Sequence, residues 1–164
     1  MLEIWGRVNS SVVQKVLWTA EELGLEYERI DHGGQYGGNE DPDYLKINPD
    51  GLIPTIQDGE FVLWESGAIM RYLAAKYDKG AIYPKDLQTR AVADQWDAWH
   101  STTMRPGMMP LLGNIGDIPI GVHAYRWFNS PIERPGMPNL EAWYRRLCER
   151  PAFQKALMQP ITMT

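Results

Sequence analysis

The sequence contains one cysteine, Cys148, so no disulfide can form within the chain. Its three histidines are scattered without the spacing of metal ligands, and no metal site is expected. A run of basic residues is also missing, and the formal net charge of −5 argues against a nucleic-acid-binding surface. No apolar stretch approaches the length of a membrane span, and no signal peptide is visible. These absences favour a cytoplasmic protein without nucleic-acid or membrane partners.

The first half of the sequence alternates between strand and helix patterns. Two strands are expected at 2–5 and 25–31, joined by a helix that Ser10 or Ser11 caps. A glycine-rich loop follows, and a short helix then begins at Asp41-Pro42, because Asp caps helices and Pro is tolerated in their first turn.

A hairpin and a longer helix complete this half. Strands at 55–57 and 60–64 flank Asp58-Gly59, a strong signal of a tight turn. Ser66 is expected to cap the helix that follows, with apolar side chains and Tyr72 on its inner face. The order β-α-β-α-β-β-α predicts an α/β domain over residues 1–78.

The second half has a different character. Residues 79–87 are polar with Gly and Pro, which is typical of a linker, and no strong strand pattern follows them. Residues 88–164 are therefore expected to form an all-helical domain. Its helices are expected at 89–105 (with Val92, Trp96 and Trp99 on one face), after a capping box at Asn114–Asp117, around 140–147, and from Pro151.

Two features of the first half point to a binding site. Pro54 cannot donate to a sheet ladder and is expected to start its strand, where the low frequency of cis X-Pro bonds, about 5%, favours a trans bond. The N–H groups of a helix N-terminus attract a carboxylate, and a glutamate can accept from an ammonium group. Glu65 and Ser66 therefore suit the zwitterionic head of an amino acid, although an ordinary N-cap beside a solvated glutamate explains them as well.

Neighbouring segments extend this pattern. Ile53-Pro54 is followed by the hairpin and by Trp64-Glu65-Ser66-Gly67-Ala68-Ile69, with 48–52 upstream. Together with the first turn at 9–16 and the stretches 114–119 and 138–153, these residues resemble the cytosolic glutathione S-transferase family. The resemblance covers most of the chain and is strongest to the theta-, delta- and nu-like members, which have a serine at the first turn.

The resemblance implies a thioredoxin-like α/β domain followed by a helical domain, with glutathione as co-substrate and a homodimeric assembly. It also implies that the Ile53-Pro54 bond is cis and that the backbone of Ile53 pairs with the cysteine of glutathione. Glu65 and Ser66 would hold the γ-glutamyl head of that tripeptide.

Activation of the glutathione thiol is expected at the first β-α turn. A free thiol has a pKa near 8.5, so a hydroxyl donor and a helix N-terminus are needed to favour the thiolate. Ser11 best matches the family's catalytic serine, Ser10 is a close competitor, and Asn9 could donate through its amide. Members that form mixed disulfides have a cysteine at this turn, whereas Cys148 lies on a late helix, so cysteine-based chemistry is not expected.

Two departures from the family pattern concern the rest of the site. Gly51 and Leu52 stand where many members have a histidine near the glycyl carboxylate, which leaves Gln35 or Lys46 as candidates. The helical domain is also short near residues 106–114. Either a deletion removed a helical hairpin or the sequence as given omits a stretch. Trp96, Trp99 and nearby methionines would then line what remains of the electrophile site.

The leading prediction is a detoxifying glutathione S-transferase that presents the glutathione thiolate to an apolar electrophile. One alternative is a glutathione-dependent reductase of disulfides or hydroperoxides on the same scaffold. Another is a non-catalytic, glutathione-binding module that dimerises.

Overall fold

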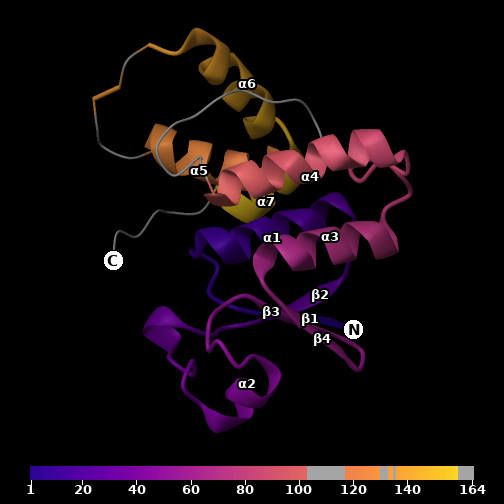
Figure 1. Cartoon of the computed structure of the whole chain (residues 1–164). Coiled ribbons are helices and arrows are strands. Elements are labelled where there is room, and N and C mark those ends of the chain that lie inside the picture. Colours follow the sequence, from indigo (N-terminus) through magenta and orange to yellow (C-terminus); the bar gives the residue numbers. More distant parts are fainter. Residues whose placement is uncertain (103–116, 130–132, 135, 159–164) are drawn as a thin grey trace. The chain divides into compact units, whose positions relative to one another are not determined.

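The computed structural model describes residues 1–102, 117–129, 133–134 and 136–158 (Figure 1). The chain divides into two compact units, Met1–Tyr77 and Asp78–Thr164. The elements of the first unit are β1 (Leu2–Trp5), α1 (Ser11–Glu22), β2 (Tyr27–Ile30), the short 3-10 helix η1 (Gly34–Tyr36), α2 (Pro42–Ile47), β3 (Thr55–Asp58), β4 (Phe61–Trp64) and α3 (Ser66–Tyr77).

The four strands form one mixed sheet in the order β2-β1-β3-β4. β1 runs parallel to β2 and antiparallel to β3, with Ile4 opposite Ile56, and the β3–β4 pair is the expected hairpin. This topology, with helices on both faces, confirms the thioredoxin-like fold of the first unit.

Alternation along β1 divides its side chains between the two faces of the sheet. Leu2 and Ile4 are buried on one face. Trp5 points to the other face, where its ring lies 5.8 Å from that of Tyr44 on α2. The apolar core of this unit consists mainly of Leu2, Ile4, Val13, Val16, Leu17, Ile56, Ile69, Met70 and Leu73.

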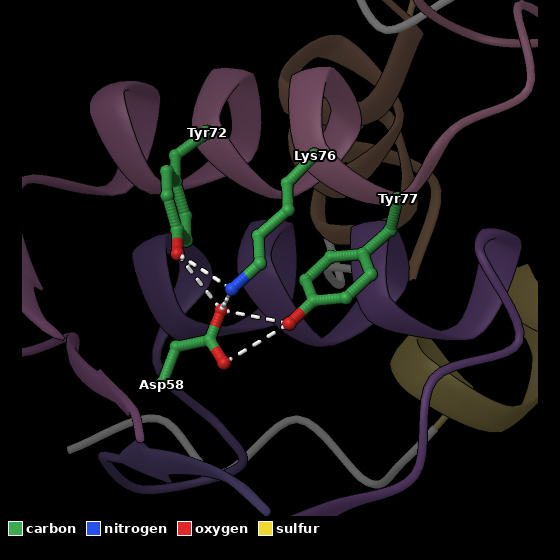
Figure 2. A network of polar contacts seen from close by, with 4 residues as sticks. All are labelled: Asp58, Tyr72, Lys76 and Tyr77. Carbon is green, nitrogen blue, oxygen red and sulfur yellow. Dashed lines mark hydrogen bonds and ion pairs between the residues drawn. The ribbon is translucent and has the colours of Figure 1, made fainter. Parts of the chain in front are cut away.

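A network of polar side chains fastens the hairpin turn to the end of α3 (Figure 2). Asp58 accepts hydrogen bonds from Tyr72 at 2.9 Å, from Lys76 at 2.8 Å and from Tyr77 at 2.8 Å. Tyr72 was expected on the inner face of the helix, but its ring is only partly buried, because its hydroxyl reaches Asp58. We call these four residues the Asp58 network.

The described part of the second unit contains helices and no strand. Its helices are α4 (Leu87–Thr102), α5 (Asp117–Asn129), α6 (Pro138–Cys148) and α7 (Pro151–Leu157). With the first unit, this composition confirms the expected fold class. Its core includes Ala93, Ile118, Ile120, Val122, Leu140, Trp143, Leu147, Phe153 and Leu157. None of the helices in the described part of the chain is long and apolar enough to cross a membrane.

The sequence grouped Val92, Trp96 and Trp99 on one face of α4, but this face is not the buried face of the helix. Val92 is 50% exposed, whereas Ala93, Asp97 and His100 are the buried positions. His100 makes a 3.1 Å hydrogen bond with His123 on α5, so a polar side chain occupies an inward position that hydrophobic periodicity could not identify. The rest of the expected capping box before Asp117 and the segment 106–114 lie outside the described residues.

Candidate functional site

One cavity of about 360 Å³ opens on the first unit, where the turn after β1, the segment before β3 and the junction of β4 with α3 meet. With Gly34 and Asn39 of the loop before α2, four regions of the sequence contribute to one concave surface, as is usual for ligand sites. The residues that line it are Arg7, Ser10, Val12, Gly34, Asn39, Asn48, Asp50, Leu52, Ile53, Pro54, Trp64, Glu65 and Ser66.

The turn after β1 brings Ser10 to the wall of this cavity. Ser10 is the N-cap of α1, since its backbone is extended and its carbonyl accepts from the N–H of Gln14 at 2.8 Å. Its hydroxyl makes no capping hydrogen bond, although the residue is only 7% exposed. A hydroxyl donor without a capping role therefore lies at a helix N-terminus beside the cavity.

Ser11 and Asn9 are placed differently. Ser11 is the first residue of α1. The described residues that line the cavity include neither Ser11 nor Asn9. The sequence could not decide between Ser10 and Ser11 as the catalytic serine, because the exact residue at which α1 begins determines which of the two faces the ligand.

The junction between β4 and α3 supplies Glu65 and Ser66. Glu65 has a φ of 72°, a left-handed conformation that is uncommon for a residue other than glycine and is often found at functional sites. Its carbonyl accepts from the N–H of Ile69 at 2.9 Å, so Glu65 occupies the capping position expected for Ser66, and Ser66 begins the helix. Both line the cavity, and Ser66 is 6% exposed.

The segment before β3 completes the wall. Ile53 and Pro54 line the cavity, and the bond between them is cis, as the resemblance implied and against the expectation from base frequency alone. Among the described residues, no hydrogen-bond acceptor is paired with the backbone N–H of Ile53.

The two candidates for the glycyl end lie elsewhere. Gln35 is exposed on η1, and its neighbour Gly34, rather than Gln35 itself, lines the cavity. Lys46 is exposed and forms a 2.6 Å ion pair with Asp43. Neither side chain is among those that line the cavity of the described first unit.

Arg7, Asn39 and Asp50 were not anticipated from the sequence. The Arg7 guanidinium packs against Gly34 so closely that a Cβ on Gly34 would lie 2.8 Å from Nη1 of Arg7, and the φ of +59° at Gly34 also favours glycine. The side chain of Asn39 donates to the carbonyl of Gly51. A lone arginine in a turn carries no periodic signal, so only the fold reveals that Arg7 reaches the cavity.

The charges around the cavity are mixed. Arg7 is the one cation among the described residues that line it, and Asp50 and Glu65 are the acids. Within the described part of the chain, no hydrogen bond or ion pair engages the side chains of Arg7, Ser10, Glu65 and Ser66. The described residues hold no cluster of three or more metal-ligating side chains. The cavity therefore offers a cation, an acid and two hydroxyls to a small, polar, charged ligand.

Similarity to known proteins is extensive. The family model of the glutathione S-transferase N-terminal domain matches residues 1–75. The glutathione S-transferase GstB of Escherichia coli K12 is 35% identical over 208 residues, in an alignment that takes in 99% of this chain and 100% of the relative. Because this chain has 164 residues, GstB carries internal residues without a counterpart here. The position expected for that shortening, 106–114, stays a prediction.

Solved structures show the same relationship. A theta class glutathione S-transferase from the citrus canker pathogen Xanthomonas axonopodis pv. citri, with glutathione bound, is 40% identical with a TM-score of 0.91, covering 98% of this chain and 99% of that one. An epsilon-class enzyme from the housefly, Musca domestica, shares the fold at 24% identity and a TM-score of 0.84, covering 96% of this chain and 92% of that one.

Proposed function

This chain belongs to the glutathione S-transferase family, and from that membership we propose that the cavity of its first unit binds glutathione and prepares the thiol for transfer to an electrophile. The observation that carries the proposal is the set of uncommitted polar groups around one cavity of the described first unit. Ser10 and Ser66 are buried, whereas Arg7 is half-buried and Glu65 is exposed. Buried polar side chains are normally hydrogen-bonded within the protein, so the two serine hydroxyls, with a cation and an acid beside them, are suited to a ligand.

Each part of glutathione finds a chemically matched group. The ammonium of the γ-glutamyl head would donate to Glu65, and its carboxylate would accept from the Ser66 hydroxyl at the start of α3, where the helix dipole favours negative charge. The cysteinyl backbone would pair with Ile53. The glycyl carboxylate would go to Arg7, the one cation among the described residues that line the cavity, rather than to Gln35 or Lys46.

Thiol activation is assigned to Ser10 in preference to Ser11. A hydroxyl that donates to sulfur favours the thiolate, and the N-terminus of the 12-residue α1 adds to the effect. The position of Ser10 on the cavity wall and the absence of a capping bond from its hydroxyl support this assignment. The sulfur then attacks the electrophile, and the leaving group departs with the bonding electrons.

The second substrate and the assembly are inferred from the family. We propose a small apolar electrophile, a homodimer, and a cytoplasmic role in detoxification. No observation on the described residues favours the disulfide reductase or the non-catalytic module, so neither is proposed.

The proposal is tested by titrating the purified protein with glutathione in a calorimeter and by following conjugation of a chloro-nitroaromatic. Binding together with conjugation is the expected result. Ultraviolet absorbance of bound glutathione against pH should show a thiol pKa below about 8.5. Absence of binding at millimolar glutathione would overturn the proposed function, and binding without conjugation of any electrophile would leave only the binding module.

A further inference from the structure

The segment between α2 and β3 lies outside any helix or strand, yet one of its carbonyl groups is held from two sides. The carbonyl oxygen of Leu52 accepts from Oη of Tyr44 at 2.6 Å and from Nδ2 of Asn48 at 2.7 Å. The preceding carbonyl, that of Gly51, accepts from the side chain of Asn39. Side chains thus fix a stretch of backbone that no sheet ladder orders.

Thr55 closes these contacts into a ring. Oγ1 of Thr55 lies 2.8 Å from Oη of Tyr44 and 2.9 Å from Nδ2 of Asn48. Counting protons fixes the direction of every bond. The two amide protons of Asn48 go to Leu52 and Thr55, the Tyr44 proton goes to Leu52, and the Thr55 proton therefore goes to Tyr44. We call Tyr44, Asn48 and Thr55 the Leu52 anchor.

The anchor is shielded from water. Tyr44 is 3% exposed, Asn48 1% and Thr55 0%. Burial raises the pKa of Tyr44 above its ordinary value, although the neighbouring Thr55 hydroxyl and Asn48 amide lower it, so the phenol keeps the proton that it donates. Aromatic packing also restrains its ring, since the His32 ring lies 3.9 Å away between centroids. Hydrogen bonds that form a chain in such surroundings polarise one another.

Fixing the Leu52 carbonyl also orients the N–H of Ile53, which belongs to the same peptide group. In a trans peptide the N–H points away from the carbonyl, and the Leu52–Ile53 bond is trans. With the Leu52 oxygen directed at the anchor, the N–H of Ile53 is directed away from it. Ile53 lines the cavity, and its N–H has no acceptor among the described residues.

From this geometry we infer that Tyr44, Asn48 and Thr55 are positioning residues for the cysteinyl part of glutathione, acting through the Leu52–Ile53 peptide without touching the ligand's cysteine. The inference rests on the proposed function. Two donors on one carbonyl hold the plane of the peptide and strengthen its N–H as a donor. The loop is thereby ordered before the ligand arrives, which lowers the entropic cost of binding.

Tyr44→Phe tests the inference because it removes one hydroxyl and keeps the ring. The affinity for glutathione should fall roughly fivefold to tenfold, the loss expected when one hydrogen bond no longer orders the site. KM for glutathione should rise by a similar factor, with kcat changed less than about twofold. Tyr72→Phe is the matched control. It also removes a bonded tyrosine hydroxyl from the first unit, but that hydroxyl belongs to the Asp58 network.

Thr55 provides a second pair of variants in case Tyr44→Phe folds poorly. Thr55→Val removes the hydroxyl that links Asn48 to Tyr44, whereas Thr55→Ser keeps it. Thr55→Val should raise KM for glutathione, and Thr55→Ser should leave it close to that of the wild type. In ¹⁵N NMR spectra of the whole protein, the Ile53 amide should shift in Tyr44→Phe and Thr55→Val but not in Tyr72→Phe.

The outcomes separate the two claims. Wild-type binding that Tyr44→Phe and Thr55→Val leave unchanged would overturn this inference alone. So would a loss of affinity in Tyr72→Phe as large as that in Tyr44→Phe, because a general loss of stability would then explain both. A wild type without measurable glutathione binding would overturn the proposed function and this inference with it.

Discussion

The polar side chains near the two ends of β3 differ in whether they are hydrogen-bonded within the protein. At its C-terminal end, Asp58 is bonded to Tyr72, Lys76 and Tyr77, and every one of these polar groups has a partner (Figure 2). At the N-terminal end, next to the cavity, the side chains of Ser10 and Ser66 are engaged by no hydrogen bond among the described residues. Thr55 at this second end is itself bonded within the Leu52 anchor, so the contrast lies between the Asp58 network and the hydroxyls of the cavity wall. The network stabilises the fold, whereas the cavity wall keeps its donors for a ligand.

The largest effect should come from Ser10→Ala. Loss of the donor to sulfur should raise the pKa of the bound thiol by about two pH units, to about 8.5, which is equivalent to about 2.7 kcal/mol. The thiolate fraction at pH 7 then falls about 25-fold, and kcat/KM should fall by a similar factor. Stability should change by less than about 0.5 kcal/mol, because the Ser10 hydroxyl makes no capping bond. Ultraviolet titration of bound glutathione and thermal unfolding measure the two quantities.

Ser11→Ala is the control for this experiment. Its hydroxyl does not belong to the cavity wall of the described first unit, so the thiol pKa should stay as in the wild type. If Ser11→Ala raises that pKa and Ser10→Ala does not, the assignment of the two serines is reversed.

Asp58→Asn should weaken the hydrogen bonds at the C-terminal end of β3. The neutral amide loses charge-assisted hydrogen bonds, and the free energy of unfolding should fall by about 2 kcal/mol. Glutathione affinity should be unchanged, since Asp58 lies outside the lining of the cavity in the described first unit. Thermal unfolding and calorimetric titration of the same sample measure both. A loss of affinity as large as the loss of stability would show that the two ends are not independent.

The pH dependence of this variant follows from the pKa of Asp58. Burial would raise that pKa, but hydrogen bonds from Lys76, Tyr77 and Tyr72 outweigh it and lower the pKa below its ordinary value. A carboxylate whose pKa is lower in the folded state stabilises the protein above its unfolded-state pKa, near 3.9, and loses this effect as pH falls through the folded-state pKa. The stability difference between wild type and Asp58→Asn should therefore be full at pH 6 and shrink below about pH 4.

Arg7→Gln should change ligand specificity, with an effect smaller than that of Ser10→Ala and larger than that of Ser66→Ala. The wild type should bind glutathione about tenfold more tightly than its glycyl monoethyl ester, because the ester lacks the carboxylate that the guanidinium would hold. The variant should bind both ligands with similar, weakened affinity in calorimetric titrations. Lys46→Gln is the matched control, since Lys46 is exposed and paired with Asp43. Unchanged discrimination in Arg7→Gln would exclude Arg7 from the glycyl end.

The sequence predicted those parts of the molecule that depend on local patterns. The hairpin at Asp58-Gly59, the short helix after Asp41 and the helices of the second half follow from turn residues, caps and periodicity, and the structure has them. Glu65 and Ser66 line the cavity because a helix start directly after a strand places them at a sheet edge. The cis form of Pro54 came from the family pattern, since base frequency favoured the trans form.

The rest depends on contacts between segments that are distant in the sequence. Which serine faces the cavity is decided by a difference of one residue in the start of α1, which is finer than sequence patterns resolve. Arg7 reaches the site because Gly34, 27 residues later, lets its guanidinium approach. The Leu52 anchor needs α2 to pack against the start of β3, and the turn-forming character of Asn48 gave no sign of its buried amide bonds.

Ser66→Ala should have the smallest effect and gives the finest test of the comparison. One hydroxyl donor to the γ-glutamyl carboxylate is worth about 1 kcal/mol, so glutathione affinity should fall roughly fivefold with no change in the pKa of the bound thiol. The residue is 6% exposed and begins α3, where alanine is accepted, so thermal stability should hardly change. Glu65→Gln in parallel should also weaken binding, because it removes the acceptor for the ammonium group. If Ser66→Ala destabilises the protein as Asp58→Asn does and leaves affinity intact, this end of β3 serves the fold as well, and the contrast between the two ends fails.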